Sequence, residues 1–537
     1  MATDFRGLDL GPVMGHAACM TRKPSAIELS LFASRVDALC EEMGALLGRT
    51  AFSPNIRDRL DYSCAAFDAS GQLLGQATHI PVHLGSMAYA MGDLAASRRW
   101  SPGEQVLLND PYAGGTHLPD ITFIAPVFVA GRLMGFVANR AHHADIGADA
   151  PGSMPISTRL DQEGLLIPPT RIMEQGTWCE PVLQGLLNQL RDGTAARGDF
   201  TAQAAANRLG AQRLEALAAL HGAAGFQRAC AALQDYGERL AQALLDELPA
   251  GEFFFRDWLD DDGAGTRDIP ISVRIDTRSR PVQVDFTGTG GQLAGNLNCP
   301  MPVTAAAVFY VFRCLMPAQT PACAGAMRGI ELLAPAGCLL NAQAPAAVAA
   351  GNVETSMRIV DVVCGALAQA LPGRIAAASQ GTMNNLAMGR AGADGWDYYE
   401  TLAGGMGAGP QAPGASARHS HMTNTLNTPV EVLERHYPLR VQRYALRRGS
   451  GGRGRLAGGD GIVREYEFLA PATLSLITER RQRGPWGLAG GEAGQAGENW
   501  LDQERLPAKV ERQVAAGQRL RVATPGGGAF GPEEPES

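Results

Sequence analysis

The sequence lacks several signatures by which an enzyme is usually assigned. It contains no GxxxxGK[ST] phosphate loop, no GxSxG nucleophile elbow, and no GxGxxG between a clear strand and a helix. None of its 10 cysteines forms a CxxC pair, and most lie in apolar surroundings, where a free cysteine acts as a small hydrophobic residue. No nucleotide site and no cysteine nucleophile is therefore predicted, and a reduced, cytoplasmic setting is expected.

Long apolar runs and large basic clusters are also missing. No run of about 18 apolar residues occurs, which excludes a transmembrane helix. The N-terminus carries acids and glycines where a signal peptide has a basic start and an apolar block. The net charge of −8 argues against binding to a phosphate backbone. We expect a protein that binds neither nucleic acid nor a membrane.

The composition is that of a globular protein too long for one core. Of 537 residues, 45% are hydrophobic and 19% charged. Strand-like and helix-like stretches occur without a regular βαβ alternation, which predicts an α+β fold of several parts with antiparallel or mixed sheets and helices. The predicted parts are an N-terminal arm (1–25), a part with the predicted metal site (26–250), a part with Gly/Asn-rich loops (251–510) and a disordered tail (511–537).

Local patterns predict individual elements. Ser25 and Glu28 form a capping box for a first helix, and His221-Gly222 is expected to break a long helical stretch over 200–248. The remaining predictions are strands around 62–75, a hairpin over 273–290, helices over 302–315 and 354–371, and a loop-rich stretch over 372–460.

The segment 109–147 concentrates acids and histidines. Its middle alternates between apolar and polar residues and reads as a strand pair, and such a hairpin would bring its two polar ends together. Imidazole nitrogen and carboxylate oxygen are ligands for Zn, Mn or Fe. A metal site is therefore favoured over the alternative, in which the acids cap turns and the histidines are hydrogen-bonded groups of the core. The polar residues at the two ends are Asp110, His117 and Asp120, and His142, His143 and Asp145.

Two further patterns carry less information. His419 and His421 share one face if HSHM (419–422) is a strand, and Asn424 and Asn427 offer amides that could orient a substrate. An Asn-rich turn with surface histidines explains this segment equally well. The glycine-rich segment 451–461 could cradle phosphate, but a tight bulge or loop crossing is the favoured interpretation.

The motifs, taken together and in order, resemble the hydantoinase B/oxoprolinase family over roughly 25–505. These motifs are 49–87 (RTAFSP to HLGSM), NDPYAGGTHLPD, NRAHHADIG with PGSMP, DFTGTG, GTMNN, WDYYETLAGGMGAG, HSHMTNTLNTP and ERRQRGPWGLAGG. The resemblance implies a subunit of an ATP-dependent hydrolase that opens a hydantoin-like or 5-oxoproline-like ring. A hydantoinase A-type partner would bind ATP and Mg and phosphorylate the substrate, in a hetero-oligomer.

The resemblance also implies roles for particular residues. Carried over to this chain, it places a divalent metal on His117, Asp120 and His142 or His143, with Asp145 as a further ligand or catalytic partner. In HSHM and the segment after it, His421 is a further catalytic candidate, and Asn424 and Asn427 are the substrate-binding candidates.

Two alternatives stay open at this point. The same metal site could serve a subunit of an ATP-dependent carboxylase of acetone or acetophenone, although the chain length is closer to the hydantoinase type. The chain could also be a non-catalytic subunit that shapes its partner. The product formed and the metal content distinguish these alternatives.

Overall fold

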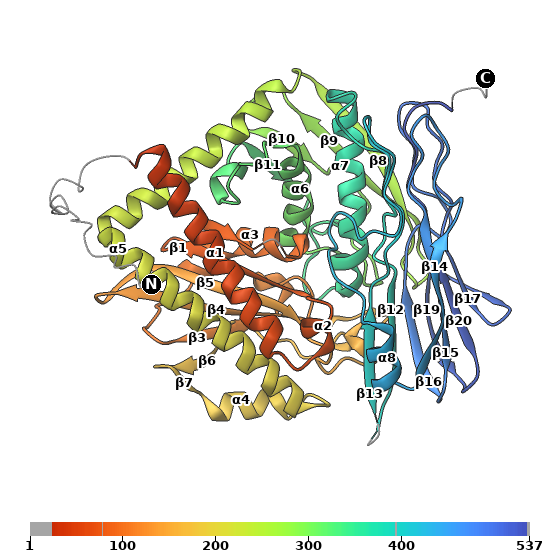
Figure 1. Cartoon of the computed structure of the whole chain (residues 1–537), viewed down its shortest axis with the longest axis horizontal. Coiled ribbons are helices and arrows are strands. Elements are labelled where there is room, and N and C mark those ends of the chain that lie inside the picture. The colour runs from red at the N-terminus through yellow and green to blue at the C-terminus, as the bar shows by residue number, and fades with distance from the viewer. Residues whose placement is uncertain (1–23, 78, 393–394, 534–537) are drawn as a thin grey trace, which may run out of the picture.

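The computed structural model describes residues 24–77, 79–392 and 395–533. Its helices and sheets form three successive layers along the long axis of the molecule (Figure 1). The predicted α+β class with antiparallel and mixed sheets is confirmed. The predicted N-terminal arm lies outside the described residues, apart from its last two positions.

The first layer is a seven-stranded antiparallel sheet with the order β2-β1-β5-β4-β3-β6-β7. The predicted hairpin of segment 109–147 is its centre, since β4 and β5 pair along their full length. The strands are β1 (Tyr62–Asp68), β2 (Leu73–Gln76), β3 (Gln105–Leu108), β4 (Asp120–Val129), β5 (Arg132–His142), β6 (Thr170–Glu174) and β7 (Thr177–Trp178).

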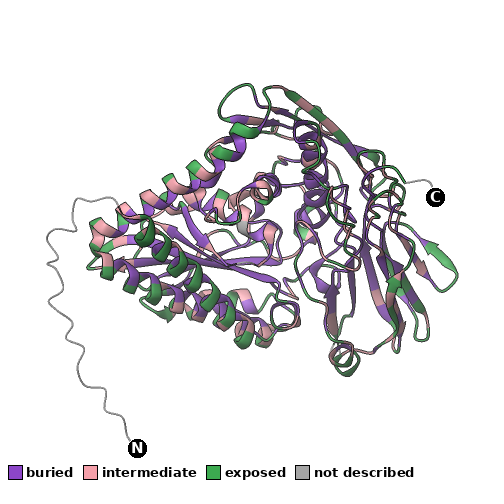
Figure 2. Ribbon diagram, turned by 45° about the horizontal axis from the view of Figure 1, so that its top comes forward, coloured by how far each residue is buried: buried purple, intermediate pink, exposed green. Residues whose placement is uncertain are grey.

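Two long helices cover one face of this sheet: α1 (Ala26–Thr50) and α5 (Gly193–Glu247). Their outer sides are exposed and their inner sides buried (Figure 2). The predicted capping box is present, because the Glu28 N–H donates to Ser25 Oγ and the Ser25 N–H donates to the Glu28 carboxylate. The predicted break is also present, at Gly222 with φ 65°. Short helices α2 (Pro54–Arg57) and α4 (Glu180–Leu187) flank them.

The opposite face of the sheet is covered by α3 (Pro81–Ala96), a helix that the sequence did not predict. It packs closely on α6 (Met301–Leu315), since a Cβ on Gly85 would lie 2.5 Å from the Cα of Ala306. With α7 (Ser356–Ala370), α6 forms the middle layer against a four-stranded sheet. Its strands are β8 (Glu252–Asp261), β9 (Arg267–Asp276), β10 (Val282–Asp285) and β11 (Ile330–Leu333). The predicted 273–290 hairpin and both predicted helices are thereby confirmed.

The third layer is a sandwich of two antiparallel sheets, which enclose a core that includes Leu386, Tyr466, Leu474 and Leu520. One sheet contains β12 (Asn385–Arg390), β13 (Trp396–Glu400), β16 (Ala472–Ile477) and β19 (Lys509–Val514). The other contains β14 (Leu439–Arg447), β15 (Gly461–Phe468), β17 (Glu498–Leu501), β18 (Glu504–Leu506) and β20 (Arg519–Ala523). The helix α8 (Val430–His436) precedes β14.

This sandwich bears on two predictions. The stretch 372–460 is loop-rich as predicted, since the three strands and α8 within it take up fewer than a third of its residues. The stretch 511–533 is not a disordered tail, because β19 and β20 pair with β16 and β15 and bury apolar side chains such as Val514 and Val522. The alternation of RLRVAT (519–524) marks the second of these strands, whereas the Gly- and Pro-rich residues that follow it suggested a tail.

The glycine-rich segments pack backbone against backbone. A Cβ on Gly405 would lie 1.9 Å from the carbonyl oxygen of Gly459, and one on Gly527 would lie 1.9 Å from that of Met406. Backbone hydrogen bonds join the same segments, including Gly527 N–H to Gly459 O at 2.9 Å. The glycines therefore permit close crossings of extended chain, in agreement with the favoured interpretation, rather than cradling a phosphate.

The remaining short helical turns are η2 (Pro111–Ala113), η3 (Pro151–Ser153), η4 (Leu160–Gln162), η5 (Ala324–Met327) and the π-helical turn η6 (Gly351–Thr355). In the part of the chain that the structure describes, no helix has the length and apolar character needed to cross a membrane.

Candidate metal centre

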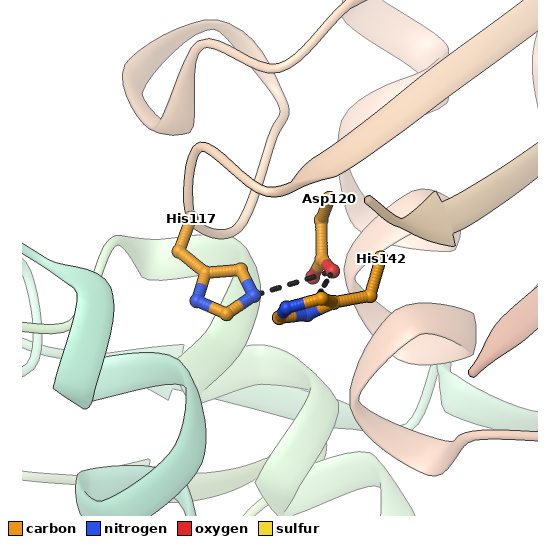
Figure 3. A group of neighbouring side chains, drawn as sticks. All are labelled: His117, Asp120 and His142. Carbon is orange, nitrogen blue, oxygen red and sulfur yellow. Dashed lines mark ion pairs between the residues drawn. The ribbon is translucent and has the colours of Figure 1, made fainter. Parts of the chain in front are cut away.

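The centre of the site is the open end of the β4–β5 hairpin. Asp120 is the first residue of β4 and His142 the last of β5, and the two face each other in register. His117 precedes Asp120 by one turn, after η2. The three side chains converge from these positions (Figure 3). Residues 25 positions apart in the chain meet because the antiparallel ladder returns the chain to its start.

The three side chains are fully inside the protein. His117 and Asp120 are 0% exposed and His142 is 3% exposed. The Oδ1 atom of Asp120 lies 3.2 Å from His117 Nε2 and 3.4 Å from His142 Nδ1. One ligand atom from each residue lies within 4.8 Å of the others. This is the geometry of a site that could hold one cation.

Several buried polar atoms of this cluster have no hydrogen-bond partner among the described residues: His117 Nε2, Asp120 Oδ1, His142 Nε2 and Asn352 Oδ1. An unpaired buried polar atom costs roughly 1–3 kcal/mol. Several such atoms in one place fit a bound cation or water molecule. The other nitrogen of His117, Nδ1, lies 3.2 Å from the carbonyl oxygen of Ala349. Donation there leaves the Nε2 lone pair directed at the cluster.

The second oxygen of Asp120 is held by the protein. Thr116 Oγ1 donates to Oδ2 at 2.6 Å and Asn352 Nδ2 donates at 3.4 Å. His83 Nε2 lies 3.2 Å from the same oxygen and 3.9 Å from Asp61 Oδ1. These contacts fix the carboxylate so that Oδ1 remains free for a ligand.

Electrostatics favour an ionised carboxylate at this position. Burial alone would raise the pKa of Asp120, but His117 and His83 beside it hold that pKa well below its usual value. Burial alone would lower the pKa of His117, but the negative charge of Asp120 beside it raises that pKa. Burial lowers the pKa of His142. A metal cation would take the place of the proton on His117, because a metal ligand must be deprotonated.

Tyr399 of β13 closes the cluster from the third layer. Its ring stacks on His142 with 4.9 Å between centroids and 8° between planes. Its hydroxyl donates to Asn385 Oδ1 at 2.7 Å, and Asn385 Nδ2 donates to the buried Glu354 at 2.6 Å. The guanidinium of Arg59 covers Tyr399, 4.8 Å from the ring centroid. The orientation of His142 is thus set by residues from three layers.

A small cavity adjoins the cluster. Its volume is ≈ 20 Å³, enough for an ion or a water molecule, since one water needs roughly 10–15 Å³. It is too small for an organic ring. Its walls come from both halves of the chain, including Asp61, His83, His142, Asn352, Tyr399, Met422, Thr423 and Thr425.

Two of the predicted site residues lie elsewhere. His143 points to the opposite face of the sheet from His142, where Nε2 lies 2.9 Å from Gln203 Oε1 and the ring contacts Phe200. The alternation of a strand separates the two adjacent histidines in this way. Asp145 follows the strand and accepts hydrogen bonds from the N–H groups of Gly147 and Arg191. The structure therefore brings His142 to Asp120 and turns away His143 and Asp145.

Three predicted residues in and after HSHM lie near the cavity but do not line it: His421, Asn424 and Asn427. His421 Nδ1 lies 3.5 Å from the hydroxyl of Tyr310, and the Asn424 amide donates to the His79 carbonyl at 3.3 Å. Asn427 donates to Glu400 and to the Thr401 carbonyl. The amides thus hold the segment in place, and the residues that face the cavity are Met422, Thr423 and Thr425.

Four residues at the site carried no role in the sequence analysis: Asp61, His83, Asn352 and Tyr399. Each stands in a stretch that the family resemblance covers or that is rich in amides. None, however, lies at a sequence separation from His117 that is typical of a metal-binding motif. His83 reaches the cluster only because α3 packs on the sheet.

Comparison with known proteins identifies the family of the chain. The family model described as hydantoinase B/oxoprolinase matches residues 25–533. The chain belongs to the hydantoinase B/oxoprolinase family.

Members of the family with assigned names are similar over nearly the whole chain. 5-Oxoprolinase 1 of Arabidopsis thaliana is 37% identical over 98% of this chain and 43% of its own length. The B component of a putative D-/L-hydantoinase from Pseudomonas sp. (strain NS671) is 31% identical over 95% of this chain and 90% of its own length. This hydantoinase B/oxoprolinase chain thus spans about two fifths of the 5-oxoprolinase that it matches.

Two solved structures share the fold. The ATP-dependent caprolactamase from Pseudomonas jessenii superposes with a TM-score of 0.87 at 26% identity, covering 95% of this chain and 92% of that one. A nucleotide-free acetone carboxylase superposes with a TM-score of 0.86, covering 95% of this chain and 76% of that one. Its 18% identity shows a common fold alone.

Proposed function

We propose that this chain is the ring-opening component of an ATP-dependent cyclic-amide hydrolase of the hydantoinase or 5-oxoprolinase type. The observation that carries the proposal is the buried His117–Asp120–His142 cluster, with its unpartnered ligand atoms, in a member of this family. The names of the relatives and of the caprolactamase support a cyclic amide as substrate.

The donor set of the cluster fits a divalent ion of the Zn, Mn or Fe type. Two imidazoles and one carboxylate are common ligands for such ions and leave positions open for water or substrate. When bound, the ion would polarise a carbonyl oxygen and lower the pKa of a coordinated water molecule.

The chain's own residues would orient the reactants. Ala349 fixes the His117 tautomer, and Thr116 and Asn352 hold the Asp120 carboxylate. Asp61 and His83 line the cavity where a water molecule would meet the substrate carbonyl. In the overall reaction the amide C–N bond breaks, the oxygen of water bonds to the acyl carbon, the nitrogen takes up a proton, and the phosphoryl group received from ATP leaves as inorganic phosphate.

The phosphorylation step is assigned to a second polypeptide of the hydantoinase A type, which would bind ATP and Mg. This chain contains no GxxxxGK[ST] loop, and it matches only 40–43% of several relatives' length. In those relatives the remaining length is available to an ATP-binding part. We therefore propose a hetero-oligomer in which this chain receives the activated substrate.

The test is co-expression with the hydantoinase A-type polypeptide, followed by assay of ADP and of ring-opened product with caprolactam, hydantoin and 5-oxoproline. The proposal expects ADP and ring-opened acid in equal amounts, lost in Asp120→Asn. A β-keto acid from acetone and labelled bicarbonate, without ring opening, would assign the chain to the carboxylases instead. Full activity of the Asp120→Asn complex would assign this chain a structural role.

A further inference from the structure

A polar cavity lies on the opposite face of the first sheet from the metal cluster. Its volume is ≈ 580 Å³, within the range of roughly 300–1,000 Å³ that is usual for small-molecule sites. The start of α5, the chain that follows β5 and the β12–β13 hairpin contribute its walls. We name it the α5 cavity and define it by Phe52, His143, Arg191, Asp199, Arg390 and Trp396.

His143 presents a hydrogen-bond acceptor to the α5 cavity. Gln203 Nε2 donates to the carbonyl oxygen of Ile121 and to Asn139 Oδ1, each at 2.9 Å, which leaves Gln203 Oε1 as an acceptor. His143 Nε2, 2.9 Å from that Oε1, therefore carries the ring proton. The other ring nitrogen, Nδ1, keeps its lone pair. It has no partner among the described residues and is not enclosed by protein atoms, so the lone pair opens to the cavity.

Asp199, on α5, presents a second acceptor to the same cavity. Only 2% of this residue is exposed. Its Oδ1 accepts from the N–H groups of Phe52 and Ser53 at 2.7 and 3.0 Å, whereas Oδ2 has no partner in the described part of the chain and is likewise not enclosed. Burial raises the pKa of Asp199, because the charged form is disfavoured away from water. A cationic ligand at Oδ2 would supply the counter-ion.

The other acids of the α5 cavity are already bound by the protein. Both oxygens of Asp397 accept from Arg191 Nη1 at 2.9 Å. Asp145 and Asp192 accept from backbone N–H groups. Arg390, by contrast, is exposed at the end of β12 and forms no ion pair with any residue that the structure describes. The groups left for a ligand are thus two buried acceptors and one guanidinium near the surface.

Aromatic side chains complete the walls. Phe52, Trp396 and Tyr437 line the α5 cavity, with 5.7 Å between the ring centroids of Trp396 and Tyr437. Such rings pack against methylene groups and attract cations through their π faces. A ligand with a short hydrocarbon chain between its charged ends therefore suits both the walls and the polar groups.

We propose that the α5 cavity binds a zwitterionic amino acid. Its ammonium group has three N–H donors, enough to reach both Asp199 Oδ2 and His143 Nδ1, and Arg390 takes its carboxylate. A divalent metal suits the site less, because the described residues gather three ligand groups closely only at the metal cluster. Opening of a lactam releases such a zwitterion, so this inference rests on the proposed function only for the source of the ligand.

Isothermal titration calorimetry of the purified full chain, without ATP, measures binding of 6-aminohexanoate, hexylamine and hexanoate. The amino acid should bind most tightly, hexylamine more weakly through its ammonium group alone, and hexanoate least. Asp199→Asn keeps an acceptor for the Phe52 and Ser53 N–H groups but loses the charge, so it should weaken binding of the amino acid at least tenfold. Arg390→Gln should remove only the preference for the amino acid over hexylamine.

Two further variants keep the test independent of the folding of Asp199→Asn. Ala195→Phe fills the α5 cavity from α5 and should abolish binding. Glu215→Gln removes one charge from the exposed side of the same helix and should leave the affinity unchanged. Hexanoate binding as tightly as the amino acid, or unchanged affinity in a folded Asp199→Asn or Ala195→Phe variant, would overturn the site.

The outcomes separate this inference from the proposed function. Asp120→Asn should bind 6-aminohexanoate as the unmodified chain does, although it loses ring opening. Loss of binding in Asp120→Asn would place the amino acid at the metal cluster and overturn the α5 cavity as its site. Ring opening by the complex without any binding of the amino acid would overturn this inference alone. Binding at the α5 cavity without any ATP-dependent ring opening would contradict the proposed function alone.

Discussion

The ring of Tyr399 lies parallel to the imidazole of His142, with 8° between their planes. This contact joins the sandwich of the third layer to the hairpin of the first. His142 has no other aromatic neighbour at this angle among the described residues, since His117 meets it edge-on at 66°. The stack therefore fixes the plane in which the imidazole nitrogens can meet a metal ion.

Replacing Tyr399 should weaken metal binding. Substitutions behind a metal ligand typically cost roughly 10–100-fold in affinity, so Tyr399→Leu should raise the dissociation constant of Zn or Mn at least tenfold. Tyr399→Phe keeps the stack and loses only the hydroxyl bond to Asn385, so it should change the affinity much less. Competition with a chromophoric chelator measures this. Equal losses in both variants would show that the hydroxyl, and not the stack, positions His142.

Glu354 should make stability depend on pH. Burial, together with repulsion by Glu479, raises its pKa from 4.5 to about 8 in the folded chain. The folded chain thus keeps a proton that the unfolded chain releases above 4.5. The stabilisation is fully present below pH 4.5 and is lost as pH rises through about 8. Over this window the free energy of unfolding should fall by up to about 1.4 kcal/mol per pH unit.

Urea denaturation of Glu354→Gln between pH 5.5 and 8.5 checks this contribution. The variant keeps an acceptor for the Met383 N–H and the Asn385 amide, so it should fold and show a flatter dependence on pH. Glu215→Gln, on the exposed side of α5, serves as the control and should keep the slope of the unmodified chain. A Glu354→Gln slope as steep as that of the control would refute the assignment.

The close glycine crossings should tolerate no side chain. Gly527→Ala would place a Cβ 1.9 Å from the Met406 carbonyl oxygen and should destabilise the chain by about 3 kcal/mol or more. Gly409→Ala is the matched control, because no heavy atom lies within 4 Å of the Cβ position there. Thermal unfolding of the two variants compares them. Similar melting temperatures would mean that the segments move apart at little cost.

Removal of the metal should destabilise the folded chain. The cluster without a cation leaves buried ligand atoms unpaired, and a ligand present at 100 times its dissociation constant stabilises by about 2.7 kcal/mol. The melting temperature should therefore fall on treatment with dipicolinate and recover when Zn or Mn is added back. His142→Gln should show neither change. A chelator effect of the same size in that variant would place the metal elsewhere.

The hairpin of the site could be predicted from the sequence, because alternation between Asp120 and His142 defines two strands and a turn. The choice between His142 and His143 could not, since it depends on where β5 ends and on the Asp120–His142 register. His83 reaches the cluster through the docking of α3, which rests on the contact of Gly85 with Ala306 over 200 residues away. Asp61 reaches it because it precedes β1, which pairs with β5 beside His142.

The sandwich was the least predictable part. Its short strands lie among glycines that are required because distant segments pack closely there, such as Gly405 against Gly459. Local composition therefore indicated a tail from 511, where β19 and β20 pair, and did not reveal the strands within the loop-rich stretch 372–460. The family motifs marked these segments, but only the three-dimensional packing explains them.

The central claim is that His117, Asp120 and His142 hold one divalent ion, and the adjacent histidines give its most direct test. The measurement is metal content by mass spectrometry in the unmodified chain, His142→Gln and His143→Gln, purified in parallel. The account predicts about one ion per chain in the unmodified protein and in His143→Gln, and almost none in His142→Gln. Full occupancy in His142→Gln, or loss confined to His143→Gln, would contradict it.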